Sequence, residues 1–158
     1  MNPMTMTKTG MSDLTVKRRF NATPEAVYDA HVDVEKLKKW MLGPEGWTMP
    51  HCALDPKVGG AFSYTWEDSN SGEQFTIRGH FVALDRPNRI EHVEVMDMPG
   101  MTSPESQVVT EFAPDGGGTL MTMTIHYDSV ESREGAIASG MEEGMAWSYD
   151  NLERIVST

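Results

Sequence analysis

Apolar and polar residues alternate along the middle of the chain, from residue 48 to residue 127. The clearest stretch is the one in which Phe62, Tyr64 and Trp66 alternate with small or polar residues. A period of two is typical of strands that bury one face, and the Ser-, Asn-, Asp- and Gly-rich segments between such stretches are typical of tight turns. Because strands joined by short turns pair in antiparallel fashion, this region predicts an antiparallel sheet.

Before this region, the pattern predicts one strand and two short helices. Residues 14–20 are rich in strand formers. Thr23 is a suitable N-cap for a helix that begins at Pro24, because its hydroxyl can accept a free N–H group and proline fits the first helical turn. A second short helix is predicted over residues 34–40, ended by the Gly-Pro pair that follows.

The last segment, residues 131–156, changes to the spacing of three or four that is typical of an amphipathic helix. Its predicted buried stripe consists of Ile137, Met141, Met145, Ser148, Leu152 and Ile155. Gly140 and Gly144 lie one turn apart on or beside this stripe, although glycine inside a helix costs about 1 kcal/mol relative to alanine. Two explanations remain open for these glycines: a close approach to the sheet, or room for a ligand.

The order of these elements predicts an α+β fold, in which a long C-terminal helix packs across a curved antiparallel sheet. The 158 residues suffice for one domain with its own core. The polar, Met- and Thr-rich residues 1–13 are expected to form a flexible tail, which leaves residues 14–158 as the single domain.

The formal net charge of −11 argues against a nucleic-acid partner and against docking on anionic membranes, since both require a basic surface. Neutral or cationic small molecules, or another protein, are the partners that this charge favours. Cys52 is the only cysteine, so no intramolecular disulfide can form, and we expect a cytoplasmic protein. The sequence leaves a homodimer open.

Four segments, taken in order, resemble the family of heat-shock-protein-90 ATPase activator homologues in the START/SRPBCC superfamily. They are residues 23–30 (TPEAVYDA), 40–44 (WMLGP), 55–60 (DPKVGG) and 140–144 with 152–154 (GMEEG and LER). The resemblance implies a helix-grip fold, in which the C-terminal helix and the curved sheet enclose a cavity. Met41 and Met145 stand where the family usually has aromatic residues. These two departures affect groups expected at the cavity and leave the fold expectation unchanged.

Several polar residues are candidates for chemistry. His80 and His92 lie on strands expected to be neighbours, and Glu94 shares the parity of His92, so a His/Glu cluster on one sheet face is one interpretation. Glu111 together with Glu94 could form a carboxylate pair. Isolated, solvent-facing side chains are the alternative in both cases. None of the five histidines has the spacing typical of a metal site, and we predict neither a metal nor a cofactor.

The aromatic residues and the methionines of the C-terminal helix either pack as core or line the cavity, and the resemblance favours the cavity. The predicted cavity residues are Trp40, Met41, Tyr64, Trp66, Arg78, His80, His92, Glu111, Met141, Gly144 and Met145. The main hypothesis is non-catalytic binding of a small hydrophobic molecule. The alternatives are an enzyme of the cyclase, hydrolase or isomerase type that uses a pocket histidine or carboxylate, and a stress-related module that binds a chaperone and modulates its ATPase.

Overall fold

The computed structural model describes residues 2–157, in which nine strands and four helices are present. They are β1 (Met4–Thr9), β2 (Asp13–Phe20), α1 (Pro24–Val32), α2 (Val34–Trp40), β3 (Trp47–Leu54), β4 (Ala61–Asp68), β5 (Gln74–Asp85), β6 (Arg89–Met98), β7 (Met101–Thr102), β8 (Ser106–Asp115), β9 (Gly118–His126), α3 (Val130–Ala138) and α4 (Met141–Val156). None of these helices is both long and apolar enough to cross a membrane.

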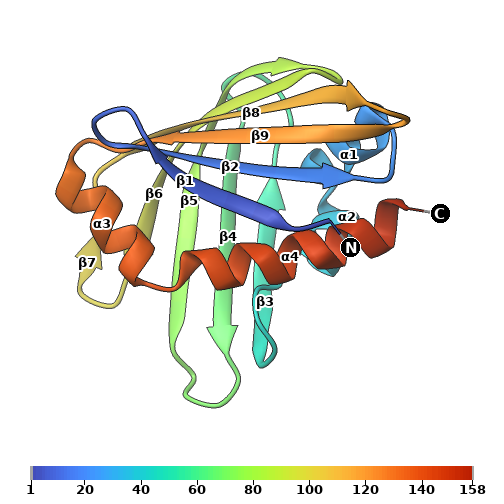
Figure 1. The fold of residues 1–158 in the computed structure, drawn as a ribbon. Coiled ribbons are helices and arrows are strands. Elements are labelled where there is room, and N and C mark those ends of the chain that lie inside the picture. Colours follow the sequence, from blue (N-terminus) through green and yellow to red (C-terminus); the bar gives the residue numbers. More distant parts are fainter. Residues whose placement is uncertain (1, 158) are drawn as a thin grey trace.

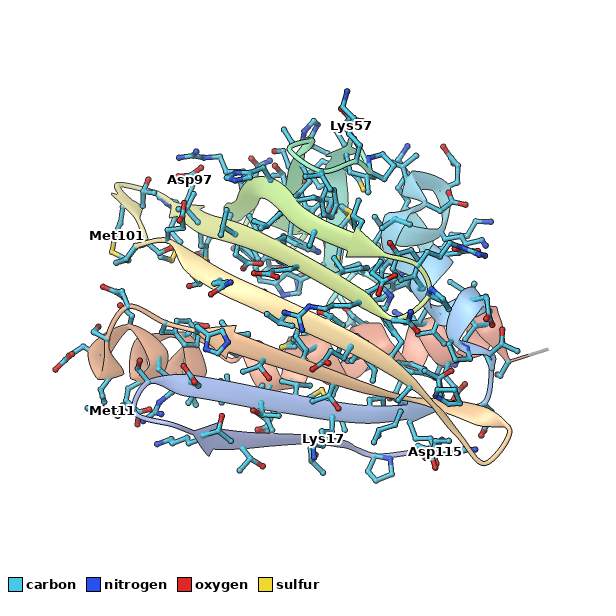
Figure 2. All side chains as sticks on the ribbon, turned by 90° about the horizontal axis from the view of Figure 1, so that it is seen from above. Met11, Lys17, Lys57, Asp97, Met101 and Asp115 are labelled. Carbon is cyan, nitrogen blue, oxygen red and sulfur yellow. The ribbon has the colours of Figure 1, made fainter. Side chains whose placement is uncertain are left out.

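The strands form one antiparallel sheet with the order β1-β2-β9-β8-β6-β5-β4-β3, and the short β7 pairs with the end of β6. The sheet is strongly curved: β3, β4 and β5 run across the direction of α4, whereas β2 and β9 run nearly along it (Figure 1). The helices lie on one face, and Figure 2, seen from above, shows α3 and α4 behind the strands. This arrangement confirms the predicted helix-grip fold.

The period-two pattern places one set of side chains on the inner face of the sheet, toward the helices. On β4 the inward residues are Phe62, Tyr64 and Trp66, all of them buried. On β2 the alternation is complete, and its inward set includes a charged residue, Arg18, between apolar neighbours.

The two short helices form where the sequence predicts them. The hydroxyl of Thr23 accepts the N–H of Ala26 at 3.2 Å, which caps α1, and Asp33 caps α2 by accepting the N–H of Glu35 at 3.0 Å. The second helix ends at Trp40, whose indole N–H donates to the carbonyl oxygen of Ala30 at 2.8 Å. This bond fixes α2 against α1 at one end of the sheet.

The expectation of a flexible N-terminal tail over residues 1–13 is wrong for the residues that the structure describes. Met4–Thr9 forms β1, which pairs with β2 along its whole length and makes one edge of the sheet. Met4 and Met6 pack against the core, while Thr5 and Thr7 are exposed. This alternation of methionine and β-branched threonine was a strand signal in the sequence.

The predicted helix over residues 131–156 is two helices, because the chain breaks at Gly140. This residue has φ +88°, a left-handed conformation that other residues rarely adopt and that no continuous α-helix contains. The first piece, α3, is capped by the hydroxyl of Ser129, which accepts the N–H of Ser132 at 3.1 Å. The second piece, α4, crosses the open side of the curved sheet (Figure 1).

The C-terminal half of α4 is fixed to the rest of the fold by specific contacts. The ring of Tyr149 stacks on Trp40 with 5.8 Å between centroids, and the hydroxyl of Ser148 accepts the N–H of Gly43 at 2.9 Å. Arg18 of β2 donates to Asp150 at 2.9 Å. These contacts join α4 to α2, to the loop that follows α2, and to the sheet.

Candidate ligand-binding cavity

A cavity of about 1210 Å³ lies between the inner face of the sheet, α2, α3 and the first turns of α4. Its wall is mainly apolar and includes tryptophan, phenylalanine, tyrosine, methionine and isoleucine side chains. Binding sites for drug-sized molecules usually enclose about 300–1,000 Å³, so this space is large for a chain of 158 residues.

The aromatic wall of the cavity is built by β4 and β5. Phe62 stacks on Tyr64 with 5.2 Å between ring centroids, and Trp66 stacks on Phe75 with 5.1 Å. The indole N–H of Trp66 donates to the carbonyl oxygen of Met41 at 2.7 Å, which ties this wall to the end of α2. These contacts hold the rings in fixed orientations around the open space.

The cover of the cavity, defined here as residues 135–145, contains the glycines noted in the sequence. A Cβ atom at Gly144 would lie 3.6 Å from Cδ of Pro44, an ordinary contact, and one at Gly135 would meet no atom within 4 Å. Neither glycine is therefore required by a close approach to the sheet. Gly140 has a different role, since its left-handed conformation makes the turn between α3 and α4.

One polar pair faces the cavity from β6. The side chains of His92 and Glu94, two residues apart on the same face of the strand, approach to 2.7 Å between Nε2 and Oε1. The imidazole of His92 also meets the ring of Phe62 edge-on, with centroids 5.1 Å apart. Among residues 2–157, no group of three or more His, Cys, Asp or Glu side chains is arranged to hold a metal ion.

His31 on α1 is a second polar residue in the wall, and the sequence analysis did not select it. Its Nδ1–H donates to the carbonyl oxygen of Val27 at 2.7 Å, since a carbonyl can only accept. Burial lowers the pKa of His31 to about 4, so the imidazole is neutral near pH 7. Its buried Nε2 has no hydrogen-bond partner among the described residues, which leaves an unpaired acceptor.

Three tyrosines of the wall keep their protons near neutral pH. Burial raises the pKa of Tyr127 to about 12, and it raises the pKa values of Tyr64 and Tyr149 as well. Tyr127 directly follows β9, and its hydroxyl lies 3.6 Å from the sulfur of Met141, which links this segment to the cover. All three phenols are therefore neutral donors.

The structure places eight of the eleven predicted cavity residues in the wall of the cavity. These are Trp40, Met41, Tyr64, Trp66, His92, Met141, Gly144 and Met145. Their participation in binding stays a prediction, but their common location follows from the parity of β4 and β6 and from the stripe on α4.

Three predicted cavity residues, Arg78, His80 and Glu111, lie on the outer face of the sheet, so their selection was wrong. Arg78 and His80 have the parity of β5 opposite to that of the inward Ile77 and Phe81. Arg78 forms an exposed ion pair with Asp97 at 2.6 Å, and Asp97 is labelled in Figure 2. The period of two correctly divides the side chains of a strand between the two faces of the sheet, but it does not show which face lies inside.

Because inward and outward residues alternate along each strand, neither of the two predicted clusters forms in full. Glu111 is exposed on β8, 4.0 Å from Arg89 and on the opposite face from Glu94, so the carboxylate pair does not form. His80 and His92 lie on neighbouring strands but on opposite faces. Of the predicted His/Glu cluster, the structure keeps only His92 with Glu94.

Other wall residues were missed by sequence reasoning. They include Trp47, Phe62, Phe75, Phe81, Met96, Met98, Val108, Met123, Ile125, Tyr127 and Tyr149. Phe62 could have been found, because it has the parity of Tyr64 and Trp66. His31 had no such signal, since one histidine on a short helix has no periodicity that points to a cavity.

Comparison with known proteins identifies one matching family. The family model described as activator of Hsp90 ATPase homologue 1-like protein matches residues 21–157. No curated protein matches the chain.

Solved structures with the same fold come from several bacteria. A protein from Rhodobacter sphaeroides is 27% identical, with 98% of each chain covered and a TM-score of 0.88. A protein from Mycobacterium smegmatis is 21% identical, with 96% of this chain and 97% of that chain covered and a TM-score of 0.83. A protein from Aeromonas hydrophila, described as AHSA1-like, is 22% identical, with 90% of each chain covered and a TM-score of 0.68.

Proposed function

The chain belongs to the family of activator of Hsp90 ATPase homologue 1-like proteins, and from this premise we propose that it binds a small hydrophobic molecule without catalysing a reaction on it. The observation that carries the proposal is the cavity of about 1210 Å³ between the sheet and the C-terminal helices. Its aromatic wall offers a large apolar contact area, and transfer of apolar surface from water into such a space is favourable.

The methionines at the cover support the same proposal. Met141 and Met145 project from the first turns of α4 into the wall of the cavity, where unbranched thioether chains can adapt to ligands of different shape. The cover therefore suits a range of apolar bodies more than one rigid molecule.

Filling the cavity from its cover should weaken binding. Ala136 of α3 lies in the wall of the cavity, and in the variant Ala136→Trp the indole would occupy part of the space where a ligand packs. We expect the affinity for an apolar fluorescent dye to fall at least about tenfold, which corresponds to about 1.4 kcal/mol. The measurement is a fluorescence titration of the purified protein with the dye, followed by native mass spectrometry of the complex.

The matched control is Ala138→Trp, two residues further along the same helix, at an exposed position outside the cavity wall. This variant adds the same side chain to α3 and should bind the dye as the unchanged protein does. Equal dye binding by the Ala136→Trp variant and the unchanged protein would place the dye elsewhere and contradict the proposal.

An enzyme is the second candidate function, and the His92–Glu94 pair favours it. A carboxylate 2.7 Å from an imidazole can orient the ring for proton transfer to a bound molecule. A ligand identified by native mass spectrometry would be incubated with the protein and with the variant His92→Gln. Conversion of the ligand by the unchanged protein alone would support catalysis, and recovery of an unaltered ligand from both would argue against it.

Binding to a chaperone stays a prediction that rests on the description of the family. Its test is a pull-down of the chaperone together with the ATPase rate of Hsp90 with and without this protein, and an unchanged rate with no capture would remove this alternative.

A further inference from the structure

The charged side chains that line the cavity are all acidic. Glu73, Glu94, Glu131 and Glu143 contribute to the wall, and none of the lysines or arginines in the described part of the chain does so. Of the two histidines of the wall, His31 is neutral near pH 7, and Nε2 of His92 is engaged by Glu94. A bound anion would therefore meet carboxylates and no permanent cation.

Glu94 is the acidic group most closely associated with the cavity. It lies on the inner face of β6, in contact with His92, and its side chain is 25% exposed. After burial, the negative charge of Glu94 is a further cause of the raised pKa values of Tyr64, Tyr127 and Tyr149. Its field thus reaches rings that come from β4, from α4 and from the segment that follows β9.

Two acceptor atoms of the wall have no donor among the described residues. The buried Nε2 of His31 carries a lone pair and has no donor among residues 2–157. Glu94 is engaged through Oε1 by His92, and no hydrogen bond to its Oε2 occurs within the described residues. A ligand group that donates hydrogen bonds would satisfy these acceptors, whereas a carboxylate ligand would leave them unpaired and add a like charge.

We infer that the cavity selects amphipathic amines: molecules with an apolar body in the aromatic wall and a protonated amino group beside Glu94. This inference rests on the proposed function, and it adds the chemical class of the ligand's head group. An alcohol donates one neutral hydrogen bond and should bind more weakly than the amine, because hydrogen bonds between charged groups are stronger. A fatty acid of the same length should bind most weakly.

Three probes with the same twelve-carbon chain test the head group: dodecylamine, dodecanol and dodecanoate, each used below the concentration at which it forms micelles or separates from solution. Displacement of the bound apolar dye gives their relative affinities. We expect the order amine, alcohol, carboxylate, with about a tenfold difference between the first and the last.

The variant Glu94→Gln removes the charge while the amide oxygen can still accept from His92. It should weaken dodecylamine binding about tenfold, strengthen dodecanoate binding and leave dodecanol nearly unchanged. Glu111→Gln is the matched control, because it makes the same change of net charge on the outer face of β8. It should leave all three affinities unaltered.

The outcomes separate the two proposals. If the dye and all three probes fail to bind, the proposed function is wrong. If the three probes bind equally well, or if Glu94→Gln and Glu111→Gln have the same effect, the head-group inference is overturned while hydrophobic binding stands.

Discussion

Replacing Arg18 by methionine is expected to lower the free energy of unfolding by about 3–5 kcal/mol, because it leaves the buried carboxylate of Glu153 without its cation. The Arg18 side chain is 1% exposed and that of Glu153 is 5% exposed, with 3.7 Å between Nη2 and Oε1. Arg18 also donates to Asp150 at 2.9 Å. In the variant, Glu153 keeps only the backbone N–H of Asn21, at 3.1 Å from Oε2. Chemical denaturation in urea, followed by circular dichroism, gives the free energy.

A second variant separates the charge from the packing. Combining Arg18→Met with Glu153→Gln removes both buried charges, and the new amide can still accept from Asn21. We expect the double variant to recover a large part of the lost stability, since a buried pair replaced as a whole costs little.

The exposed pair of Arg78 and Asp97 is the control for the loss of an arginine. Its side chains are 54% and 33% exposed, so Arg78→Met should cost less than about 1 kcal/mol. A loss of similar size for Arg18→Met and Arg78→Met would show that the buried pair does not hold α4 to β2.

Truncating Trp40 to alanine should destabilise the protein by about 3–5 kcal/mol, the range for large aromatic side chains in a core. Trp40 is 2% exposed, stacks on Tyr149 and donates to the carbonyl oxygen of Ala30 at 2.8 Å. The substitution removes the ring, leaves that carbonyl without its side-chain donor and opens space between α2 and α4. Thermal and urea unfolding both measure the loss.

Trp147 of α4 is the matched tryptophan, because 42% of its surface is exposed. Trp147→Ala should change the free energy of unfolding by less than about 0.5 kcal/mol. Equal effects of the two truncations would contradict the assignment of Trp40 to the core. Trp40 also borders the cavity, so the two roles considered for it in the sequence are both present in one residue.

The elements of the fold were largely predictable because their signals are local. The Thr23 cap, the alternation of Phe62, Tyr64 and Trp66, and the stripe on α4 each depend on neighbours a few residues away. Residues 4–9 also carried a local signal, the alternation of methionine and threonine, although a flexible tail was predicted there. The break at Gly140 was different, since a glycine in a left-handed turn and a glycine inside a helix look alike in a sequence.

The site was less predictable because it depends on which face of each strand lies inside. Arg78 and His92 occupy the adjacent strands β5 and β6, yet one points to solvent and the other into the cavity. Which face of each strand lies inside depends on the curvature of the whole sheet and on the helices that cover it. His31 illustrates the same limit, since its position depends on how α1 packs against Trp40 and Phe112.

The break at Gly140 divides the C-terminal segment into parts that are attached to different regions of the protein. The helix α3 is linked to the first hairpin through Lys8 and Glu134, at 2.6 Å, while the end of α4 is held by Arg18. The cover of the cavity lies between these two attachments, so its side chains can be exchanged without removing either one. Under the proposed function, substitution of cover residues other than Gly140 would change the ligand specificity, while Arg18 and its partners keep the end of α4 in place.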